Sequence, residues 1–307
     1  MEKPSLPSGT RDFSPQVMLR RKYITAAMER VFLSHGFGAL ETPSIENLKT
    51  LQGKYGNEGD QLLFKVLNSG DFLSKAESSL LQAKDSKGIT PQISDRGLRY
   101  DLTVPLARYV VMNRNEIVFP FKRYQMQPVW RADRPQKGRY REFWQCDIDV
   151  VGANSVVSEA ELIEMYQEVF SALDLGVKIR INHRGILDAF MGVLGSKEHW
   201  DAFMVIIDKA DKIGYEGVAK ELEEKGLSVA INAWKWLWDS KSLMGNGLKM
   251  ECAADAEFLQ GDALSRGLSE LKSIFALVGN TENVELDFTL ARGLSYYTGA
   301  VFEVEAL

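Results

Sequence analysis

Two strand-like runs joined by a short cationic loop constrain this chain more than any other feature of its sequence. The runs are FKRYQMQPVWRAD (121–133) and YREFWQCDIDVVG (140–152), which are rich in aromatic and β-branched residues. That composition is typical of strands. The loop between them contains Pro135 and Gly138, which favour a turn. The sequence therefore predicts an antiparallel hairpin.

The second run has two unlike faces, because side chains alternate along a strand. One face suits packing and includes Cys146 as a small core residue; it holds Tyr140, Glu142, Trp144, Cys146, Ile148 and Val150. The other face is polar, with Arg141, Phe143, Gln145, Asp147 and Asp149. A solvated face is the ordinary interpretation of such a pattern.

Three observations favour a binding site on the polar face instead. Phe143 would be poorly placed in open water, and a second Gly-containing turn brings Arg292. The adjacent loop is cationic, with Arg131, Arg134, Lys137, Arg139 and Arg141. Fixed cations and one stacking aromatic ring suit a nucleotide with a small polar ligand. Asp147 is interpreted as a solvated or structural charge, and Arg141 as either a phosphate contact or a salt-bridge partner.

The order of elements predicts an α+β fold, mainly antiparallel, with a helical insertion between two strands. Ser14 and Pro15 predict a helix start, and Ser158 with Glu161 predicts a capping box. The stretch AWKWLWDS (233–240) fits a strand or a helix, and its tryptophans are interpreted as core. Predicted domains are a first core part at 1–184, a helical insertion at 185–280, and returning core strands at 281–307.

The composition excludes several classes of protein. A net charge of −5 argues against non-specific coating of nucleic acid, which depends on neutralising phosphates. Two cysteines without a CxxC argue against a disulfide framework or a structural zinc site and fit a reducing cytosol. No apolar run approaches the ~20 residues of a membrane span. The histidines, His35, His183 and His199, are expected at a helix end, a strand end and the surface, not as metal ligands.

The usual glycine-rich nucleotide motifs are missing, so arginines and a metal would hold phosphate. Three segments then carry a resemblance to one family. WRADRPQKGRYREFWQCDID (130–149) resembles motif 2 of the class II aminoacyl-tRNA synthetases in its histidyl form. LARGLSYYTGAVFE (290–303) resembles the histidine signature of the histidyl-tRNA synthetase family, and RYDLTVPLARYV (99–110) its amino-acid-contacting segment. LPSGTRDFSP and the helix leading to ETPSIE resemble the opening of the family and motif 1, with Pro43 as its proline.

The resemblance implies a fold, an activity and partners. The fold would be a class II synthetase-like antiparallel sheet flanked by helices, with a helical insertion domain. The chain would be a histidine–tRNA ligase that activates L-histidine with ATP and Mg²⁺ and transfers it to tRNA(His). Motif 1 would build a homodimer, and the protein would be cytoplasmic.

The resemblance also implies roles for single residues. Arg131 and Arg292 would be catalytic, stabilising charge at the α-phosphate. ATP would meet Arg131, Asp133, Arg139 and Phe143, with Phe143 stacked on adenine. Histidine would be bound by Asp101, Thr103, Arg131, Gln145, Asp149, Arg292, Tyr296 and Tyr297. The tRNA acceptor end would meet Arg134 and Gln136, and no residue is assigned to a metal.

Two other interpretations compete with the enzyme. A synthetase-like paralogue could sense histidine as the regulatory subunit of ATP phosphoribosyltransferase, and a non-catalytic module could bind tRNA. Such paralogues tend to lose the motif 2 arginines and the signature tyrosines, whereas Arg131, Arg139, Arg292, Tyr296 and Tyr297 are present. The sequence ends before the family's glycine-rich motif 3 and anticodon-binding domain, so weaker adenylation is expected of this chain.

Overall fold

The chain folds into two compact units, Met1–Ala153 and Asn154–Leu307. A computed structural model describes residues 3–54, 62–243, 245–256, 259, 261–291 and 297–307. Each unit combines helices with small, largely antiparallel sheets, so the predicted α+β class is confirmed. The division into these two units falls between Ala153 and Asn154 and does not test the predicted domain limits near residues 184 and 280, which stay a prediction.

The first unit is organised around the predicted hairpin, whose strands are β5 (Phe121–Trp130) and β6 (Glu142–Val151). The strands are antiparallel in full register from Phe121↔Val151 to Trp130↔Glu142, and β1 (Gly38–Ala39) pairs with β5 in parallel. A second sheet has the order β2-β4-β3. Its strands and the helices of this unit are β2 (Ile45–Asn47), β3 (Lys65–Val66), β4 (Arg96–Leu98), α1 (Pro15–Ser34), α2 (Leu48–Leu51), α4 (Ser78–Gln82), α5 (Ser86–Ile93) and α6 (Thr103–Met112).

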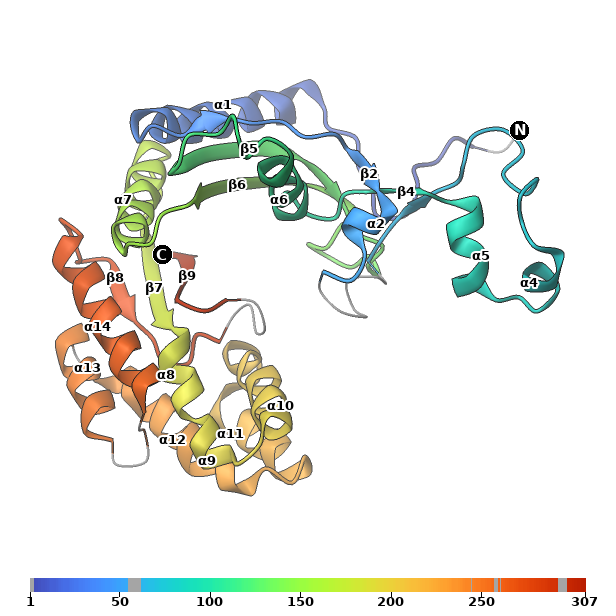
Figure 1. Cartoon of the computed structure of the whole chain (residues 1–307). Coiled ribbons are helices and arrows are strands. Elements are labelled where there is room, and N and C mark those ends of the chain that lie inside the picture. Colours follow the sequence, from blue (N-terminus) through green and yellow to red (C-terminus); the bar gives the residue numbers. More distant parts are fainter. Residues whose placement is uncertain (1–2, 55–61, 244, 257–258, 260, 292–296) are drawn as a thin grey trace. The chain divides into compact units, whose positions relative to one another are not determined.

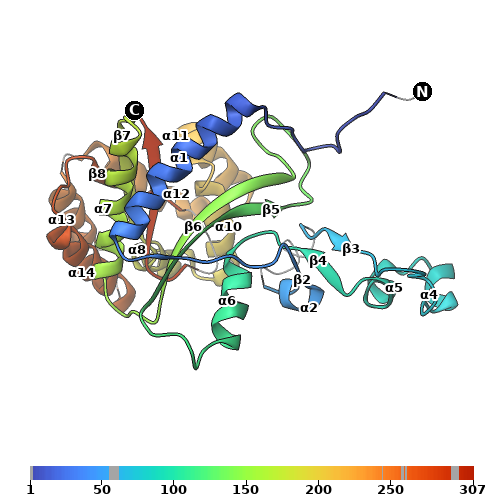
Figure 2. The same ribbon diagram turned by 90° about the horizontal axis from the view of Figure 1, so that it is seen from above.

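Helices α1 and α6 lie on opposite faces of the hairpin (Figures 1 and 2). Helix α1 begins as predicted, with the Ser14 hydroxyl accepting from Val17 N–H and Pro15 in the first turn. Its Phe32 ring packs 5.5 Å from Tyr124 of β5, so α1 covers the face of the even-numbered residues. The odd-numbered face carries the predicted site, and the segment that leads into α6 lies against it, with the Leu102 carbonyl accepting from Arg123.

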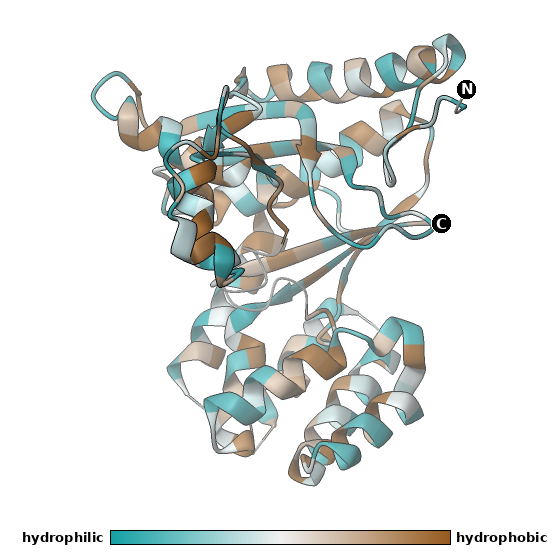
Figure 3. Ribbon diagram, turned by 90° about the vertical axis from the view of Figure 1, so that its right-hand side faces the viewer, coloured by the Kyte–Doolittle hydropathy of each residue, from teal (hydrophilic) through white to brown (hydrophobic). Residues whose placement is uncertain are grey.

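The second unit holds the predicted strand–helices–strand order. Strand β7 (Val177–His183) pairs in parallel with β8 (Val284–Leu286) and antiparallel with β9 (Ala300–Ala306). The helices carry both hydrophobic and hydrophilic residues (Figure 3), as amphipathic helices around a core do. The helical elements of the unit are α7 (Val157–Ala172), α8 (Arg184–Ala189), α9 (Met191–Leu194), α10 (Lys197–Ile207), α11 (Ala210–Glu224), η1 (Ser228–Ala230), α12 (Ile231–Asp239), η2 (Ser240–Ser242), α13 (Asn246–Asp255) and α14 (Asp262–Leu277).

The tryptophan-rich stretch lies in helix α12, which decides between the two sequence interpretations. Trp234 is fully buried in the main apolar cluster and stacks on Tyr215 at 6.0 Å. Trp236 and Trp238 are partly buried against the same cluster. Spacing alone could not separate strand from helix, whereas packing of Trp234 against Trp238 uses the i,i+4 spacing of a helix.

Other local predictions meet mixed outcomes. Helix α7 starts at Val157, before Ser158, so the predicted capping box is wrong. Cys146 is exposed in this chain, so its placement in the core is wrong too. His183 ends β7 as predicted, but it is buried and its Nε2 contacts Glu270 Oε2 at 2.8 Å. Among the described residues, no helix is long and apolar enough to cross a membrane.

Candidate active site

The odd-numbered face of the hairpin brings six polar side chains together in three directly opposed pairs. These pairs are Arg123↔Asp149, Gln125↔Asp147 and Gln127↔Gln145. Residues opposed in an antiparallel pair share a face and lie within reach of one another. The face is buried on the β5 side, because Arg123 and Gln125 are 0% and 1% exposed. The polar face predicted from the sequence is therefore not an open solvated surface.

Arg123 is the buried charge at the base of this face. Its Nη2 lies 2.7 Å from Asp149 Oδ2, an ion pair by distance. Its Nη1 donates to Gln125 Oε1 at 3.2 Å and its Nη2 to the Leu102 carbonyl at 3.3 Å. A buried guanidinium is stable only when it is paired and hydrogen-bonded. Arg123 thus holds Asp149, a predicted histidine ligand, through an ion pair, while Arg123 Nε and Asp149 Oδ2 have no hydrogen-bond partner among the described residues.

Three carboxylates surround that single guanidinium, and they perturb one another. Burial raises the pKa of Asp147 to about 6, and the neighbouring charge of Asp149 adds to the rise. Burial also raises the pKa of Asp149, which Arg123 opposes and Asp101 reinforces. An excess of negative charge in a half-buried site favours a cationic ligand, since the carboxylates remain undercompensated. The amino group or imidazolium of an amino acid meets that requirement.

Gln145 carries a buried atom that the fold leaves unsatisfied. Its Oε1 is inaccessible to solvent and has no hydrogen-bond partner within the described part of the chain. Buried polar atoms are nearly always hydrogen-bonded, and exceptions need an explanation such as a missing ligand. An N–H donor on a ligand would satisfy this oxygen.

Arg131 stands at the end of β5, beside the ring predicted to stack on adenine. Its Nε donates to the Tyr100 carbonyl at 2.9 Å, and its guanidinium lies 5.1 Å from the centre of the Phe143 ring. The Nε contact leaves the two terminal nitrogens available for an anion, and the ring contact restricts the plane of the guanidinium. The two residues form a cation–aromatic pair suited to a nucleotide phosphate and base.

The cationic loop is held in shape by an ion pair between two of its own residues. Arg139 binds Asp133 through two contacts, Nε to Oδ2 at 3.1 Å and Nη2 to Oδ1 at 2.9 Å. Arg141 Nε donates to the Asp133 carbonyl at 3.0 Å, so Arg141 braces the loop. In that contact the acceptor is a backbone oxygen and not a carboxylate. Gly138 supplies the left-handed turn residue, with φ +80°. Arg134 and Gln136, the predicted tRNA contacts, are exposed on this loop.

Asp101 and Thr103 both lie at the start of α6 (Thr103–Met112), and only Asp101 of the two is close to the carboxylates of the polar face. Asp101 is buried and its Oδ1 accepts from Val104 N–H at 3.1 Å, so the carboxylate caps the helix. Thr103 is the first helical residue and is exposed. Asp101 is close enough to Asp147 and Asp149 to raise the pKa of both. It therefore belongs to the same electrostatic site.

Arg99, which was not among the predicted site residues, supports the polar face by hydrogen bonds to β5 and to the segment before Pro43. It is 0% exposed, and its Nη1 donates to Gln127 Oε1 at 2.8 Å and to the Thr42 carbonyl at 2.6 Å. The Pro128 carbonyl accepts from its Nε and Nη2. These bonds tie the segment before Pro43 to β5, the strand that leads into Arg131.

The histidine signature lies in the second unit and is only partly described. Tyr297 is 44% exposed. Arg292 and Tyr296 lie outside the described residues, as does most of the signature turn. The roles predicted for these three residues stay predictions.

The sequence reasoning missed Arg123 and left Asp147 outside the site. Both lie on the same face as Gln145 and Asp149, and applying strand alternation to β5 as well as to β6 would have indicated Arg123. The opposition of Arg123 and Asp149 depends on the register of the hairpin, which alternation does not supply. Asp147, interpreted as a solvated or structural charge, lies half-buried on the polar face opposite Gln125, and burial raises its pKa to about 6.

Comparisons with known proteins identify the family of this chain. The sequence model of the histidyl-tRNA synthetase family matches residues 71–306. The histidine–tRNA ligase of Christiangramia forsetii is 51% identical over 318 residues, which cover 99% of this chain and 68% of that protein. The histidine–tRNA ligase of Cytophaga hutchinsonii is 50% identical, with 100% of this chain and 68% of that protein covered.

Solved structures give the same result. A histidyl-tRNA synthetase from Nostoc sp. PCC 7120 superposes with a TM-score of 0.79 at 31% identity, covering 99% of this chain and 65% of that one. A Bacillus halodurans protein described as an ATP phosphoribosyltransferase regulatory subunit/histidyl-tRNA synthetase also gives 0.79, at 25% identity, covering 100% of this chain and 74% of that one. The regulatory alternative is thus no better supported than the enzyme. The chain spans about two thirds of the length of these ligases, and it belongs to the histidyl-tRNA synthetase family.

Proposed function

We propose that this chain carries the amino-acid-activating site of a histidine–tRNA ligase. Histidine would lie on the polar face of the β5–β6 hairpin, and ATP would lie beside Arg131 and Phe143. The observation that carries the proposal is the buried, unpartnered Oε1 of Gln145, which lies on a face with an excess of carboxylates within the described residues. A ligand that is both cationic and rich in N–H donors satisfies both features.

Histidine fits those features. One ring nitrogen of a neutral imidazole donates to an amide or carboxylate oxygen, both donate in the imidazolium, and the amino group is a cation. Gln145 Oε1 and Asp149 would accept from these groups, and Asp101 would add its negative charge. An analogue without ring nitrogens would leave buried polar atoms unpaired, which is the condition for sharp rejection.

The chemical step requires positioning and charge stabilisation rather than a protein nucleophile. A carboxylate oxygen of histidine attacks the α-phosphorus of ATP, a new O–P bond forms, and pyrophosphate leaves. Arg131 would bind the α-phosphate through its terminal nitrogens, because its Nε is held by the Tyr100 carbonyl. Removing one such charge contact typically lowers the rate by about 10²–10³.

The nucleotide would also depend on the loop. Arg139, braced by Asp133, would approach the outer phosphates, and Phe143 would stack on the base. The described residues contain no group of three or more His, Cys, Asp or Glu side chains placed to hold a metal ion. Mg²⁺ would therefore arrive with the ATP phosphates, and no step above depends on it.

Transfer to tRNA(His), homodimerisation through motif 1 and a cytoplasmic location complete the proposal. Arg134 and Gln136 are exposed on the loop, where an acceptor end could reach them. Exposed apolar side chains on α1, including Leu19, Tyr23 and Ile24, support an interface on that helix. The helical block at 185–280 would meet tRNA as the family's insertion domain.

ATP–pyrophosphate exchange tests the proposal, with histidine and with each other amino acid singly. Exchange with histidine alone is the expected result. Histidine binding measured by calorimetry, without exchange, would favour the regulatory-subunit alternative. Absence of both binding and exchange would refute the assignment of the polar face.

A further inference from the structure

The segment that leads into the histidine signature is fastened to strand β7 by a dense set of bonds. Asp287 N–H donates to the Ile181 carbonyl at 2.9 Å, continuing the β7–β8 pairing. Asn182, which is 0% exposed, donates from Nδ2 to the carbonyls of Phe288 and Leu290, both at 3.0 Å. Every residue from Asp287 to Leu290 is buried. The segment therefore has its position set by β7.

The Asp287 carboxylate is the centre of this fastening. Its Oδ1 accepts from Thr289 N–H at 2.9 Å and from the Thr289 hydroxyl at 2.7 Å, which shapes the turn. Its Oδ2 accepts from Arg180 Nε at 2.9 Å and lies 2.7 Å from Arg180 Nη2. Both side chains are nearly inaccessible, Arg180 at 9% and Asp287 at 6% exposed. Charge-assisted bonds of this kind are the strong ones.

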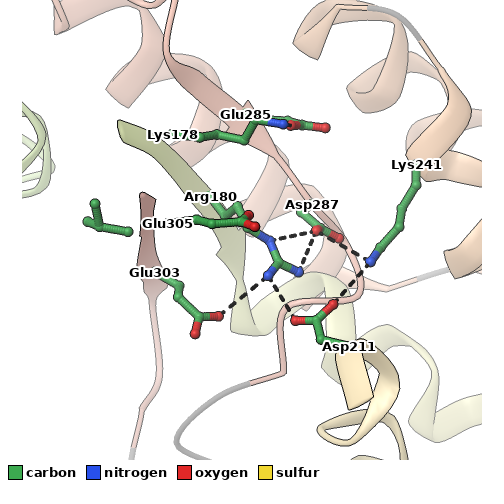
Figure 4. Close-up of a pocket in the computed structure, with 9 residues that line it drawn as sticks. Lys178, Arg180, Asp211, Lys241, Glu285, Asp287, Glu303 and Glu305 are labelled. Atoms are coloured by element: carbon green, nitrogen blue, oxygen red, sulfur yellow. Dashed lines mark hydrogen bonds and ion pairs between the residues drawn. The ribbon is translucent and has the colours of Figure 1, made fainter. Parts of the chain in front are cut away.

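The helical block supplies two further members of the cluster. Asp211, near the start of α11, binds Arg180 Nη1 at 2.9 Å, and Lys241 lies 3.5 Å from Asp211 and 3.8 Å from Asp287. Figure 4 shows these four side chains converging from the sheet and from the helices at the wall of a pocket of about 570 Å³. The charges of this cluster pair with one another, which favours a clamp over a site for a charged ligand.

We propose that Arg180 is a positioning residue for adenylation, acting through Asp287 on the turn that precedes the histidine signature. The inference rests on the proposed function, because the signature's Arg292 contributes only if the chain adenylates histidine. Leu290 is fixed by Asn182, and Arg292 follows two residues later, a distance of at most ~7 Å along the backbone. A shift of the turn is therefore carried into the signature. Misplacing a catalytic group by about 1 Å can lower a rate about 10²-fold.

The proposal also gives the helical block an influence on catalysis. Asp211 and Lys241 belong to that block, whereas Arg180 and Asp287 belong to the sheet. A movement of α11 that withdraws Asp211 leaves Arg180 Nη1, among the described residues, with Glu303 alone, at 3.6 Å, and so relaxes the restraint on the guanidinium that holds Asp287. A ligand that moves the helices would thus change the rate of adenylation without touching its substrates.

Steady-state pyrophosphate exchange by the Arg180→Met variant tests the positioning role. The kcat is expected to fall about 10- to 100-fold, with the KM for ATP within about threefold, since the ATP-binding residues of the hairpin are untouched. The Arg180→Lys variant keeps the positive charge but lacks the two-pronged guanidinium. Its kcat is therefore expected to lie between that of the unaltered chain and that of Arg180→Met. Lys178→Met is the matched control, because Lys178 lies on the same face of β7 and pairs with Glu285 at 2.9 Å, outside the turn. Its kcat should match that of the unaltered chain.

Hydrogen–deuterium exchange of the peptide covering residues 284–291 tests the same fastening without catalysis. Arg180→Met should speed exchange of the Thr289 amide about 10-fold or more, and Asp211→Asn by a smaller factor, while Lys178→Met leaves it unchanged. Unchanged kcat and unchanged amide exchange in folded Arg180→Met would overturn the proposal, as would equal losses in Lys178→Met. An unaltered chain without exchange activity would overturn the proposed function and the catalytic role together. The amide measurement would then still decide whether Arg180 holds the turn.

Discussion

Replacement of Asp147 by Asn should stabilise the hairpin at neutral pH and leave it unchanged in acid. Asp147 is half-buried, and burial raises its pKa from 3.8 to about 6, with Asp149 reinforcing the rise and Arg123 opposing it. A carboxyl whose pKa is raised by folding stabilises the fold while it is protonated in both states. That contribution is complete below pH ~4 and is lost as the pH rises through 6.

The size of the effect follows from the shift. About two pKa units at about 1.36 kcal/mol each correspond to about 3 kcal/mol at pH 7.5. Asp147 is only half-buried, so solvent screening reduces the expected gain from Asp147→Asn to about 2 kcal/mol. Asparagine keeps the shape and the polar contacts but carries no charge at any pH. The stability difference between the two proteins should therefore grow between pH 4 and pH 7 and then level off.

Hydrogen–deuterium exchange of peptides covering β5 and β6 measures this difference locally, with both proteins compared at each pH. Asp12→Asn is the matched control, since Asp12 is exposed and the substitution is the same. A stability gain that is equal at pH 4.5 and pH 7.5 would show that the charge of Asp147 is not the cause. A loss of stability at pH 7.5 would mean that the ionised carboxylate is favourably paired, contrary to the argument.

Three further outcomes follow from the structure. In urea titrations, Arg123→Met should lower the free energy of unfolding by about 3–5 kcal/mol, because Asp149 is left buried without its counter-charge. The double variant Arg123→Met/Asp149→Leu should recover much of that lost stability. Gln145→Met should raise the Kd for histidine about 10-fold in calorimetry with little change in stability, because the atom it removes has no partner among the described residues; Gln82→Met, at an exposed position, should leave the Kd unchanged. Trp234→Ala should lower the free energy of unfolding by about 3–5 kcal/mol and reduce the near-ultraviolet circular dichroism of the helical block, and an unchanged spectrum would contradict its place in the core.

Much of the candidate site could be predicted because it lies on one continuous strand. Phe143, Gln145 and Asp149 share a face through alternation alone, and Arg131 and Asp133 begin the loop between the two strands. Their placement required only local periodicity and turn chemistry. The capping of α6 by Asp101 was not predicted, because a cap depends on which side chain reaches the free N–H groups of the folded helix.

Long-range neighbours were beyond the reach of such reasoning. Arg99 belongs to the site through contacts with Thr42 and Gln127, 57 and 28 residues away in the sequence. Strand alternation predicts Cys146 as a core residue, but Cys146 is exposed, because its face of β6 is covered only in part within this chain. Neither outcome is encoded in a local pattern, since each depends on which distant segment packs against the strand.

Periodicity, turn residues and motif spacing are local properties of the chain, and they were enough to predict the hairpin, the order of strands and helices, and the family. Which charges meet depends on the folded chain. Arg123 opposes Asp149 through the register of two strands, and Arg180 gathers Asp287 and Asp211 from 107 and 31 residues away. The pKa of Asp147 rises for the same reason: desolvation and the Coulomb interaction depend on distance in space, and the chain sets that distance only when it folds.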